Sequence, residues 1–275
     1  ETTASKPSVH HLPTLMLYEA SLRTNFAAHV IPEGIRMDML ILAPSAKDPS
    51  KSSLTHMLEA VRRDLGSQES DFYVDEGGIQ FDRLVQDLKR AEKRASPICL
   101  LGTAFAFVHV LDRCQREGLR FSLAPGSRIM DTGGYKGKSR ELSREDLHAL
   151  YEATLGVHSG HVVNEYGMTE MGTQFYDSVL RQTIRGAVQL RYKITPPWAR
   201  TVVVDPETLE PLPKGQIGLL RHYDLTNRGS AMAIQTDDLG YHIEEGFEIL
   251  GRADGAEARG CSIAIDELLN QAGED

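Results

Sequence analysis

Cysteine and tryptophan are scarce in this chain of 275 residues, which has three cysteines and one tryptophan. So few cysteines, in an odd number, argue against a secreted scaffold held by disulfides and suit a reducing cytoplasm. Positive charge is also in short supply, with 30 Lys and Arg residues against 39 Asp and Glu residues. The net charge of −9 repels phosphate backbones, so general nucleic-acid binding is disfavoured, whereas a local pocket for a small phosphate compound is compatible with it.

Long apolar runs are absent as well. The most apolar stretch, residues 98–111, contains Gly102, Thr103 and His109, and it falls short of the roughly 18 apolar residues of a membrane-spanning helix. The N-terminal residues lack the apolar core of a signal peptide. They begin without Met, in what looks like the middle of a loop, so we expect further residues upstream. The length predicts one or two globular domains.

Alternating helical and strand patterns predict an α/β fold in the first half. Short apolar runs predict strands at residues 36–43, 97–101, 127–131 and 161–164. Apolar residues three and four apart predict helices at residues 13–30, 52–65, 79–95, 104–116 and 143–155. This alternation indicates a large, mostly parallel sheet flanked by helices. Ligands of such sheets bind beyond the carboxyl ends of the strands, which directs attention to the loops after Asp131 and Asn164.

The second half has shorter, β-branched runs, which are separated by turn sequences at residues 205–208 and 213–215. These features predict a smaller antiparallel β unit. We therefore expect an α/β core at residues 1–186, a β-rich subdomain at residues 187–250, and a hinge with a C-terminal tail at residues 251–275.

The sequence Asn-Glu-Tyr-Gly-Met-Thr-Glu at residues 164–170 follows a predicted strand. The ring of Tyr166 can stack on a flat base, and Gly167 permits close approach of a backbone. Thr169 can bind a phosphate or carboxylate oxygen, and the carboxylate of Glu170 can hold a hard cation such as Mg²⁺. A turn between a strand and a helix, with a capping Thr and a core Tyr, explains the same residues without a ligand.

Two later motifs place charge beside glycine. The adjacent carboxylates of Asp237 and Asp238 precede Gly240, where we predict a turn, and such a carboxylate can accept both hydroxyls of a ribose. Arg252 follows Gly251 in a second predicted turn, which is charged and flexible. Hairpin turns use Asp and Gly in the same way, so each motif alone also has a purely structural interpretation.

In this order, the three motifs resemble those of the adenylate-forming superfamily, which contains acyl-CoA synthetases, luciferases and adenylation domains. The sequence Asp-Thr-Gly-Gly-Tyr at residues 131–135 resembles the glycine loop on the adenine side of that superfamily. A narrower similarity, over almost the whole chain, is to the acyl-protein synthetases of bacterial bioluminescence fatty-acid reductase systems. It rests on five segments, LLGTAFAF, MDTGGYKGKSREL, NEYGMTEMGTQFYD, PPWARTVVVDPETL and GRADGAEARGCSIAIDEL.

The resemblance implies a role for each matching residue. Tyr166 would stack on adenine, Thr169 would contact the α-phosphate or the acyl carboxylate, and Glu170 would bind Mg²⁺. Asp238 would hold the ribose hydroxyls, and Arg252 would reach the ribose or a phosphate. The other residues expected to bind the nucleotide are Gly133, Gly134, Tyr135, Glu165 and Gly167.

The resemblance also implies an activity. ATP and Mg²⁺ would activate a fatty or aryl carboxylic acid as an acyl adenylate, and the acyl group would then pass to a protein cysteine. Bound metal and cationic side chains suit this reaction, because a carboxylate must approach an anionic phosphate. The alternatives are a coenzyme A ligase and a non-catalytic nucleotide- or acyl-binding subunit of a reductase complex. The expected partners are the acid and a reductase or acyl-carrier protein.

The chain departs from the superfamily pattern in three places. Residues 2–8 stand where the phosphate loop is expected but lack its glycines, so Lys6 is either a phosphate contact or part of a disordered terminus. The ribose motif reads Thr-Asp-Asp in place of Thr-Gly-Asp, which keeps Asp237 as an alternative to Asp238. Nine residues follow Asp266, so we expect the C-terminal lid domain with its catalytic lysine to be absent or vestigial.

Cys261 is the candidate acyl acceptor, because the bioluminescence relatives transfer an acyl group to a cysteine near the C-terminus. A small buried cysteine is the competing interpretation. The cations at residues 136–140 are candidate substitutes for the lid lysine, or else a solvated basic loop. His11 is a candidate for the acyl pocket, and Cys99, in an apolar strand, is expected in the core.

Overall fold

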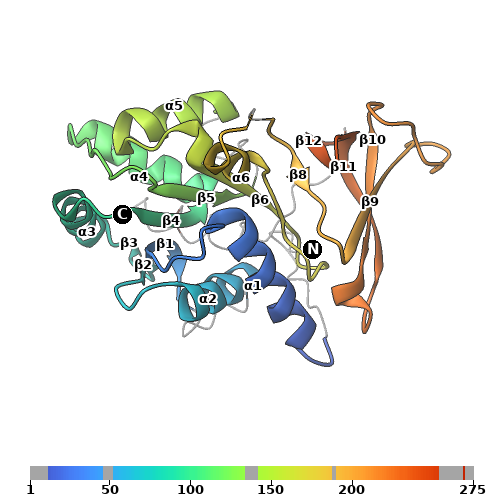
Figure 1. Cartoon of the computed structure of the whole chain (residues 1–275), viewed down its shortest axis with the longest axis horizontal. Helices are drawn as coiled ribbons and strands as arrows, with labels where there is room; N and C mark the ends of the chain where they lie inside the picture. The colour runs from blue at the N-terminus through green and yellow to red at the C-terminus, as the bar shows by residue number, and fades with distance from the viewer. Residues whose placement is uncertain (1–11, 46–51, 134–141, 188–189, 254–268, 270–275) are drawn as a thin grey trace. The chain divides into compact units, whose positions relative to one another are not determined.

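The computed structural model describes residues 12–45, 52–133, 142–187, 190–253 and 269 (Figure 1). The chain divides into two compact units. We call Val30–Asn164 with Ser262–Asp275 the parallel-sheet unit, and Glu1–His29 with Glu165–Cys261 the β-rich unit. The expected domain division at residues 186 and 250 stays a prediction.

A seven-stranded sheet has the order β3-β2-β1-β4-β5-β6-β7. Its strands are β1 (Asp38–Pro44), β2 (Asp71–Asp75), β3 (Gly78–Ile79), β4 (Ile98–Thr103), β5 (Arg128–Thr132), β6 (Val162–Tyr166) and β7 (Phe175–Tyr176). Strand β1 runs parallel to β2 and β4, and β4 runs parallel to β5, whereas β3 and β7 are antiparallel to their neighbours. The predicted mostly parallel sheet is therefore confirmed.

Helices cover both faces of this sheet within the parallel-sheet unit. In Figure 1, α4 (Ala104–Arg116) and α5 (Arg144–Leu155) lie on one face of it, and α2 (Ser53–Leu65) lies on the other. The central strands are consequently buried on both sides, and β4 and β5 have no exposed residue. This burial explains the apolar run at the start of β4, and it requires partners for the charged residues of β5, where Arg128 pairs with Glu33 and Asp131 with Tyr151 and Asn164. The remaining helices are α1 (Met16–Val30), α3 (Phe81–Arg94), α6 (Val179–Ile184) and the short turns η1 (Ser159–His161) and η2 (Leu225–Asn227).

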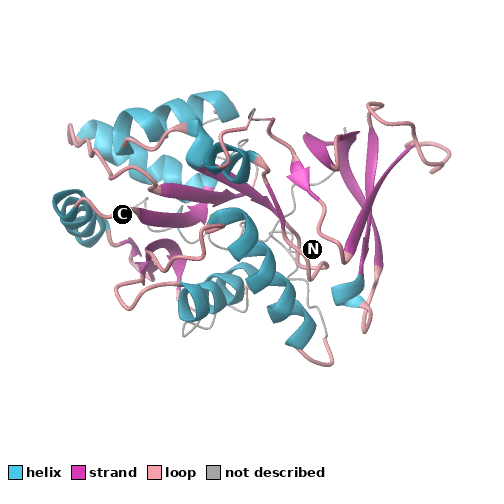
Figure 2. Cartoon of the chain, viewed as in Figure 1, coloured by secondary structure: helices cyan, strands magenta, loops and turns pink. Residues whose placement is uncertain are grey.

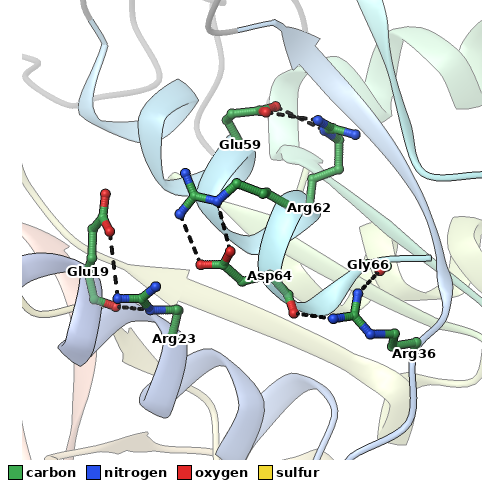
Figure 3. Close-up of polar contacts among 8 residues, drawn as sticks. Glu19, Arg23, Arg36, Glu59, Arg62, Asp64 and Gly66 are labelled. Atoms are coloured by element: carbon green, nitrogen blue, oxygen red, sulfur yellow. Dashed lines mark hydrogen bonds and ion pairs between the residues drawn. The ribbon is translucent and has the colours of Figure 1, made fainter. Parts of the chain in front are cut away.

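Polar side chains complete the ends of the helices. The hydroxyl of Ser143 accepts a hydrogen bond from the backbone N–H of Asp146 at 3.0 Å, which confirms the predicted cap of α5. At the end of α2, the guanidinium of Arg36 donates to the carbonyl oxygens of Gly66 and Asp64, at 2.6 and 3.0 Å (Figure 3). These carbonyls lie beyond the last helical hydrogen bonds, so Arg36 satisfies acceptors that the helix leaves open.

The β-rich unit contains a five-stranded antiparallel sheet of order β8-β12-β11-β10-β9. Its strands are β8 (Lys193–Ile194), β9 (Ala199–Val204), β10 (Gly218–Asp224), β11 (Ala233–Ile243) and β12 (Gly246–Arg252). Figure 2 shows it as strands and loops with the short turn η2. Its core is an apolar cluster of Met171, Phe175, Val203, Leu220 and Phe247. The predicted antiparallel unit is confirmed.

Several local predictions are wrong. The turn expected at Gly240 does not form, because Gly240 lies inside the continuous strand β11. A Cβ at Gly240 would lie 2.3 Å from the carbonyl oxygen of Glu248, so this glycine permits close strand approach beside a bulge. Gly251 and Arg252 likewise belong to β12 and not to a flexible turn. The helix predicted at residues 13–30 begins later than expected, since Leu15 precedes α1 and is 44% exposed.

The hairpin of β2 and β3 was missed by the sequence reasoning, because its short segments fall between two strong helical patterns. Among the described residues, no helix is both long enough and apolar enough to cross a membrane.

Candidate functional site

Three of the sequence motifs meet in the β-rich unit. The hydroxyl of Tyr166, at the end of β6, donates a hydrogen bond to Oδ2 of Asp238 on β11 at 2.6 Å. Arg252 on β12 lies directly opposite Asp238 in the antiparallel register, with its Nε 3.7 Å from Oδ1 of Asp238. The structure thus brings the tyrosine, the ribose-type aspartate and the arginine into one cluster.

Strand geometry separates the two adjacent aspartates. Neighbouring residues of a strand point to opposite faces, so Asp238 contacts Tyr166, whereas Asp237 contacts Arg252, with its Oδ2 3.4 Å from a guanidinium nitrogen. The Asp237 side chain is 54% exposed and that of Asp238 is 15% exposed. Burial raises the pKa of the Tyr166 phenol well above its usual value, and the negative charge of Asp238 raises it further. Tyr166 therefore stays a neutral hydrogen-bond donor at any physiological pH.

Two polar residues, His222 and Thr201, lie next to Tyr166 and against the apolar cluster. Nε2 of His222 on β10 is 3.4 Å from the Tyr166 hydroxyl oxygen, and Nδ1 of His222 is 3.0 Å from the hydroxyl of Thr201 on β9. The rings of Phe175 and Phe247 lie 5.1 and 5.5 Å from the His222 ring. His222 is fully buried, and this burial lowers its pKa to about 3, so the imidazole is neutral.

The turn that carries Thr169 and Glu170 is held by the strand end that follows His222. Asp224, fully buried, accepts hydrogen bonds at Oδ2 from the backbone N–H groups of Gly172 and Thr173, at 3.0 and 2.9 Å. The amide of Asn227 donates to the carbonyl oxygen of Glu170. These contacts anchor the backbone on the C-terminal side of Thr169.

The predicted metal ligand, Glu170, is half-buried in this turn. Among the described residues, no group of three or more His, Cys, Asp or Glu side chains is arranged to hold a metal ion by itself. A single carboxylate on an anchored backbone fits a different donor set, in which Mg²⁺ is completed by phosphate oxygens and water. The role of Glu170 as a magnesium ligand stays a prediction.

Glu165 and Gly167 flank the tyrosine, and the structure explains them together. The side chain of Glu165 is buried, and a Cβ at Gly167 would lie 2.5 Å from its Oε1. Gly167 therefore leaves room for the Glu165 carboxylate. Both residues are in or next to β6, so the motif predicted to follow a strand instead begins as one.

In the parallel-sheet unit, the described part of the glycine loop begins at the end of β5. Gly133 has φ of 89°, a left-handed conformation that favours glycine. The buried carboxylate of Asp131 accepts hydrogen bonds from the hydroxyl of Tyr151 at 3.1 Å and the amide of Asn164 at 2.7 Å. This pair of donors fixes the strand end from which the loop leaves.

The other predicted functional residues lie outside the described residues. They are Lys6, His11, Gly134, Tyr135, the cations at 136–140 and Cys261. The described cysteines, Cys99 and Cys114, are buried, and burial raises their pKa values to about 12 and about 11. Cys99 is therefore in the core, as predicted.

The sequence reasoning missed the buried polar residues of β10. Leu220, His222 and Asp224 occupy alternate positions that face inward. Polar residues in the inward series of an alternating strand are a detectable signal, because buried polar groups require partners.

Comparisons with known proteins agree with this architecture. The profile of the family described as "Acyl-protein synthetase, LuxE" matches residues 37–270. The chain is 27% identical over 214 residues to the long-chain-fatty-acid–luciferin-component ligase of Aliivibrio fischeri, covering 74% of this chain and 54% of that protein. The corresponding ligase of Vibrio harveyi is 27% identical over 208 residues, covering 72% and 52%. The chain thus spans about half the length of these relatives.

Solved structures share the fold. ATP-bound MatB from Rhodopseudomonas palustris aligns with a TM-score of 0.58 at 20% identity, covering 86% of this chain and 44% of that one. McyG A-PCP in complex with phenylalanyl-adenylate aligns with a TM-score of 0.57 at 17% identity, covering 86% of this chain and 38% of that one. Identities this low concern the fold alone. Because the family profile spans most of its residues, the chain belongs to the LuxE acyl-protein synthetase family.

Proposed function

We propose that this chain uses ATP to convert a fatty or aryl carboxylic acid into an acyl adenylate and then passes the acyl group to a thiol. Family membership supports this activity, and so do the names of the two curated relatives, which are long-chain-fatty-acid ligases. The use of ATP is further supported by an ATP-bound neighbour with the same fold. Mg²⁺, coenzyme A and a reductase partner are parts of the proposal that rest on the resemblance.

One observation carries the proposal. Tyr166 and Asp238 are 72 residues apart in the chain, yet they share a short hydrogen bond, and Arg252 faces the same carboxylate. A half-buried ring beside a carboxylate and a guanidinium suits a nucleoside phosphate, which has a flat base, a diol and negative charge. In this assignment Tyr166 stacks on adenine, Asp238 accepts the ribose hydroxyls and Arg252 neutralises phosphate charge.

The first chemical step joins two anions. A carboxylate oxygen of the acid attacks the α-phosphorus of ATP, a P–O bond forms, and the bond to the bridging oxygen breaks with release of pyrophosphate. Magnesium, when bound, neutralises phosphate charge in such a step. The side chains of Thr169 and Glu170 lie on the turn that Asn227 and Asp224 hold in place, and we assign them to the phosphate region.

The second step releases AMP. A thiolate attacks the acyl carbonyl carbon, a thioester forms, and the bond to the phosphate oxygen breaks. Cys261 is our candidate for this thiol. Gly133, Gly134, Tyr135, Glu165 and Gly167 keep their proposed roles as nucleotide contacts, and Lys6 keeps its proposed role as a phosphate contact.

Acid-dependent exchange of radioactive pyrophosphate into ATP tests the first step. We expect exchange with a fatty or aryl acid, and a decrease of at least about 100-fold in Asp238→Ala and Glu170→Ala, since each removes a charged contact to the reacting groups. Asp205→Ala is the matched variant, because Asp205 is an exposed turn carboxylate of the same unit. Exchange without acid dependence, or unchanged rates in both site variants, would refute the proposal.

Intact-mass analysis tests the second step. After incubation with ATP and acid, we expect an acyl adduct that maps to Cys261 and is lost in Cys261→Ser. A coenzyme A ligase would instead release acyl-CoA, and it would do so equally well in Cys261→Ser. Binding of ATP without acid-dependent turnover would identify a non-catalytic subunit.

A further inference from the structure

Four side chains of the β-rich unit form a chain of hydrogen bonds that ends at the proposed nucleotide site. Thr201 on β9 is paired with His222 on β10 in the sheet register, and their side chains are 3.0 Å apart. His222 in turn is 3.4 Å from the hydroxyl of Tyr166, which is 2.6 Å from Asp238. Four different strands thus contribute to one chain of hydrogen bonds.

The direction of each hydrogen bond follows from the number of protons available. An ionised carboxylate is an acceptor, so the single hydroxyl proton of Tyr166 is donated to Asp238. The Tyr166 oxygen must then accept from His222, which places the imidazole proton on Nε2. Nδ1 of His222 is left as an acceptor, and the hydroxyl of Thr201 donates to it. By donating to Nδ1, Thr201 therefore stabilises the imidazole tautomer that Tyr166 requires.

The surroundings keep His222 in this state. Its ring is fully buried and lies against the rings of Phe175 and Phe247. The hydroxyl of Thr236 also lies against the Tyr166 hydroxyl and lowers its pKa, but its single proton is donated to the carbonyl oxygen of Leu220 at 2.8 Å. Within the described part of the chain, the imidazole N–H of His222 is consequently the donor that remains for the Tyr166 oxygen.

We propose that Thr201 and His222 are positioning residues that orient the Tyr166 hydroxyl and, through it, the Asp238 carboxylate toward the hydroxyls of the bound ribose. This inference rests on the proposed function, since it needs ATP at this site. Neither residue contacts the nucleotide in the proposal. Tyr166 binds Oδ2 of Asp238, and Arg252 faces Oδ1. The Asp238 carboxylate is therefore held at one value of its χ2 torsion angle.

Thr201→Val tests the idea with little change of volume, because it replaces the donor hydroxyl by a methyl group. We expect the KM for ATP to rise about fivefold with kcat nearly unchanged, which is the loss expected for one neutral hydrogen bond. The preference for ATP over 2′-deoxy-ATP should fall by a similar factor, because the misoriented carboxylate recognises the diol less well. Thr201→Ser keeps the hydroxyl and should retain the parental KM and preference.

A structural defect without repositioning would lower activity toward both nucleotides equally. An unchanged preference in folded Thr201→Val, beside a parent enzyme that prefers ATP, would overturn the inference and leave the proposed function standing. A parent that neither binds ATP nor exchanges pyrophosphate would instead overturn the proposed function.

The tautomer offers a test that needs no activity. Nitrogen-15 NMR of the ligand-free protein, with the His222 signals assigned by their loss in His222→Gln, should show the proton on Nε2. Thr201→Val should alter the Nδ1 shift of this residue. A proton on Nδ1 in the parent protein would overturn the inference, whatever the stability of the variants.

Discussion

Asp224 holds Thr173 through two hydrogen bonds, accepting one from its backbone N–H at 2.9 Å and one from its hydroxyl at 2.8 Å. The same carboxylate accepts from the backbone N–H and the hydroxyl of Thr226, at 2.9 and 2.6 Å. Trp198 donates to the hydroxyl oxygen of Thr173 at 3.2 Å. A single buried carboxylate thus joins the turn η2 to the loop after Glu170.

Removing this carboxylate should destabilise the protein strongly. In Asp224→Ala the buried donors of Gly172 and Thr173 lose their acceptor, and we expect a loss of about 3 kcal/mol or more, measured by urea unfolding. Asp224→Asn keeps one acceptor oxygen, so its loss should be intermediate.

Asp205 provides the comparison, because it also accepts hydrogen bonds from backbone N–H groups but lies in an exposed turn. Water can replace those contacts, so Asp205→Ala should cost much less than Asp224→Ala. Equal losses for the two variants would show that burial of the Asp224 network does not matter.

His29 makes the stability of the protein depend on pH. Nε2 of His29 is 3.1 Å from a guanidinium nitrogen of Arg181, and Nδ1 is 2.9 Å from the carbonyl oxygen of Asn25. Arginine is a donor in every state, so Nε2 must accept and the ring is neutral. Burial lowers the pKa of His29 from 6.5 to about 4, against a backbone hydrogen bond that raises it, and the charge of Arg181 lowers it further.

Between these two pKa values the unfolded chain binds one more proton than the folded chain. The contribution of neutral His29 to the free energy of unfolding is therefore complete above pH 6.5, and it is lost as the pH falls toward 4. The free energy of unfolding should fall more steeply in the parent than in His29→Gln, by at most about 1.4 kcal/mol per pH unit. If the free energies of unfolding of the parent and of His29→Gln, measured by urea titration, fell in parallel between pH 6.5 and 4, the assignment would be contradicted.

Gly240 should tolerate no side chain, although its backbone is extended. In Gly240→Ala the new Cβ meets the carbonyl oxygen of Glu248 at 2.3 Å, so β11 and β12 must separate. We expect a loss of about 2 kcal/mol or more in thermal or urea unfolding. Gly215 has a positive φ of 85°, but a Cβ there would meet no other atom within 4 Å. Gly215→Ala should therefore lower the free energy of unfolding by about 1 kcal/mol. A smaller loss at Gly240 than at Gly215 would contradict the close approach.

The buried cysteines should be unreactive in the native protein. Cys99 and Cys114 are buried with raised pKa values, so neither presents a thiolate to a reagent at pH 8. We expect the Cys261→Ser variant to react with a thiol reagent such as dithionitrobenzoate only after unfolding in guanidinium chloride. Rapid labelling of the folded variant would mean that one of these two thiols is accessible, and acyl adducts would then have to be mapped for both.

Local patterns predicted much of the secondary structure, because helices and buried strands depend on neighbouring residues. The helix at Ala104–Arg116 has the predicted bounds, and the Ser143 cap forms as its spacing indicates. By contrast, the turn predicted at Gly240 was wrong, since glycine serves both turns and close strand contacts. The neighbouring strand determines which of the two applies.

The sequence by itself determined the family and the candidate motifs, since short strings such as Asn-Glu-Tyr-Gly-Met-Thr-Glu are contiguous in the chain. The tertiary structure decided which motif residues meet. The register of β11 against β12 places Asp238 opposite Arg252, and the alternation of β11 turns Asp238 and not Asp237 toward Tyr166. The support from His222 and Asp224 also appears only in three dimensions, because pairing and burial join residues that are distant in the chain.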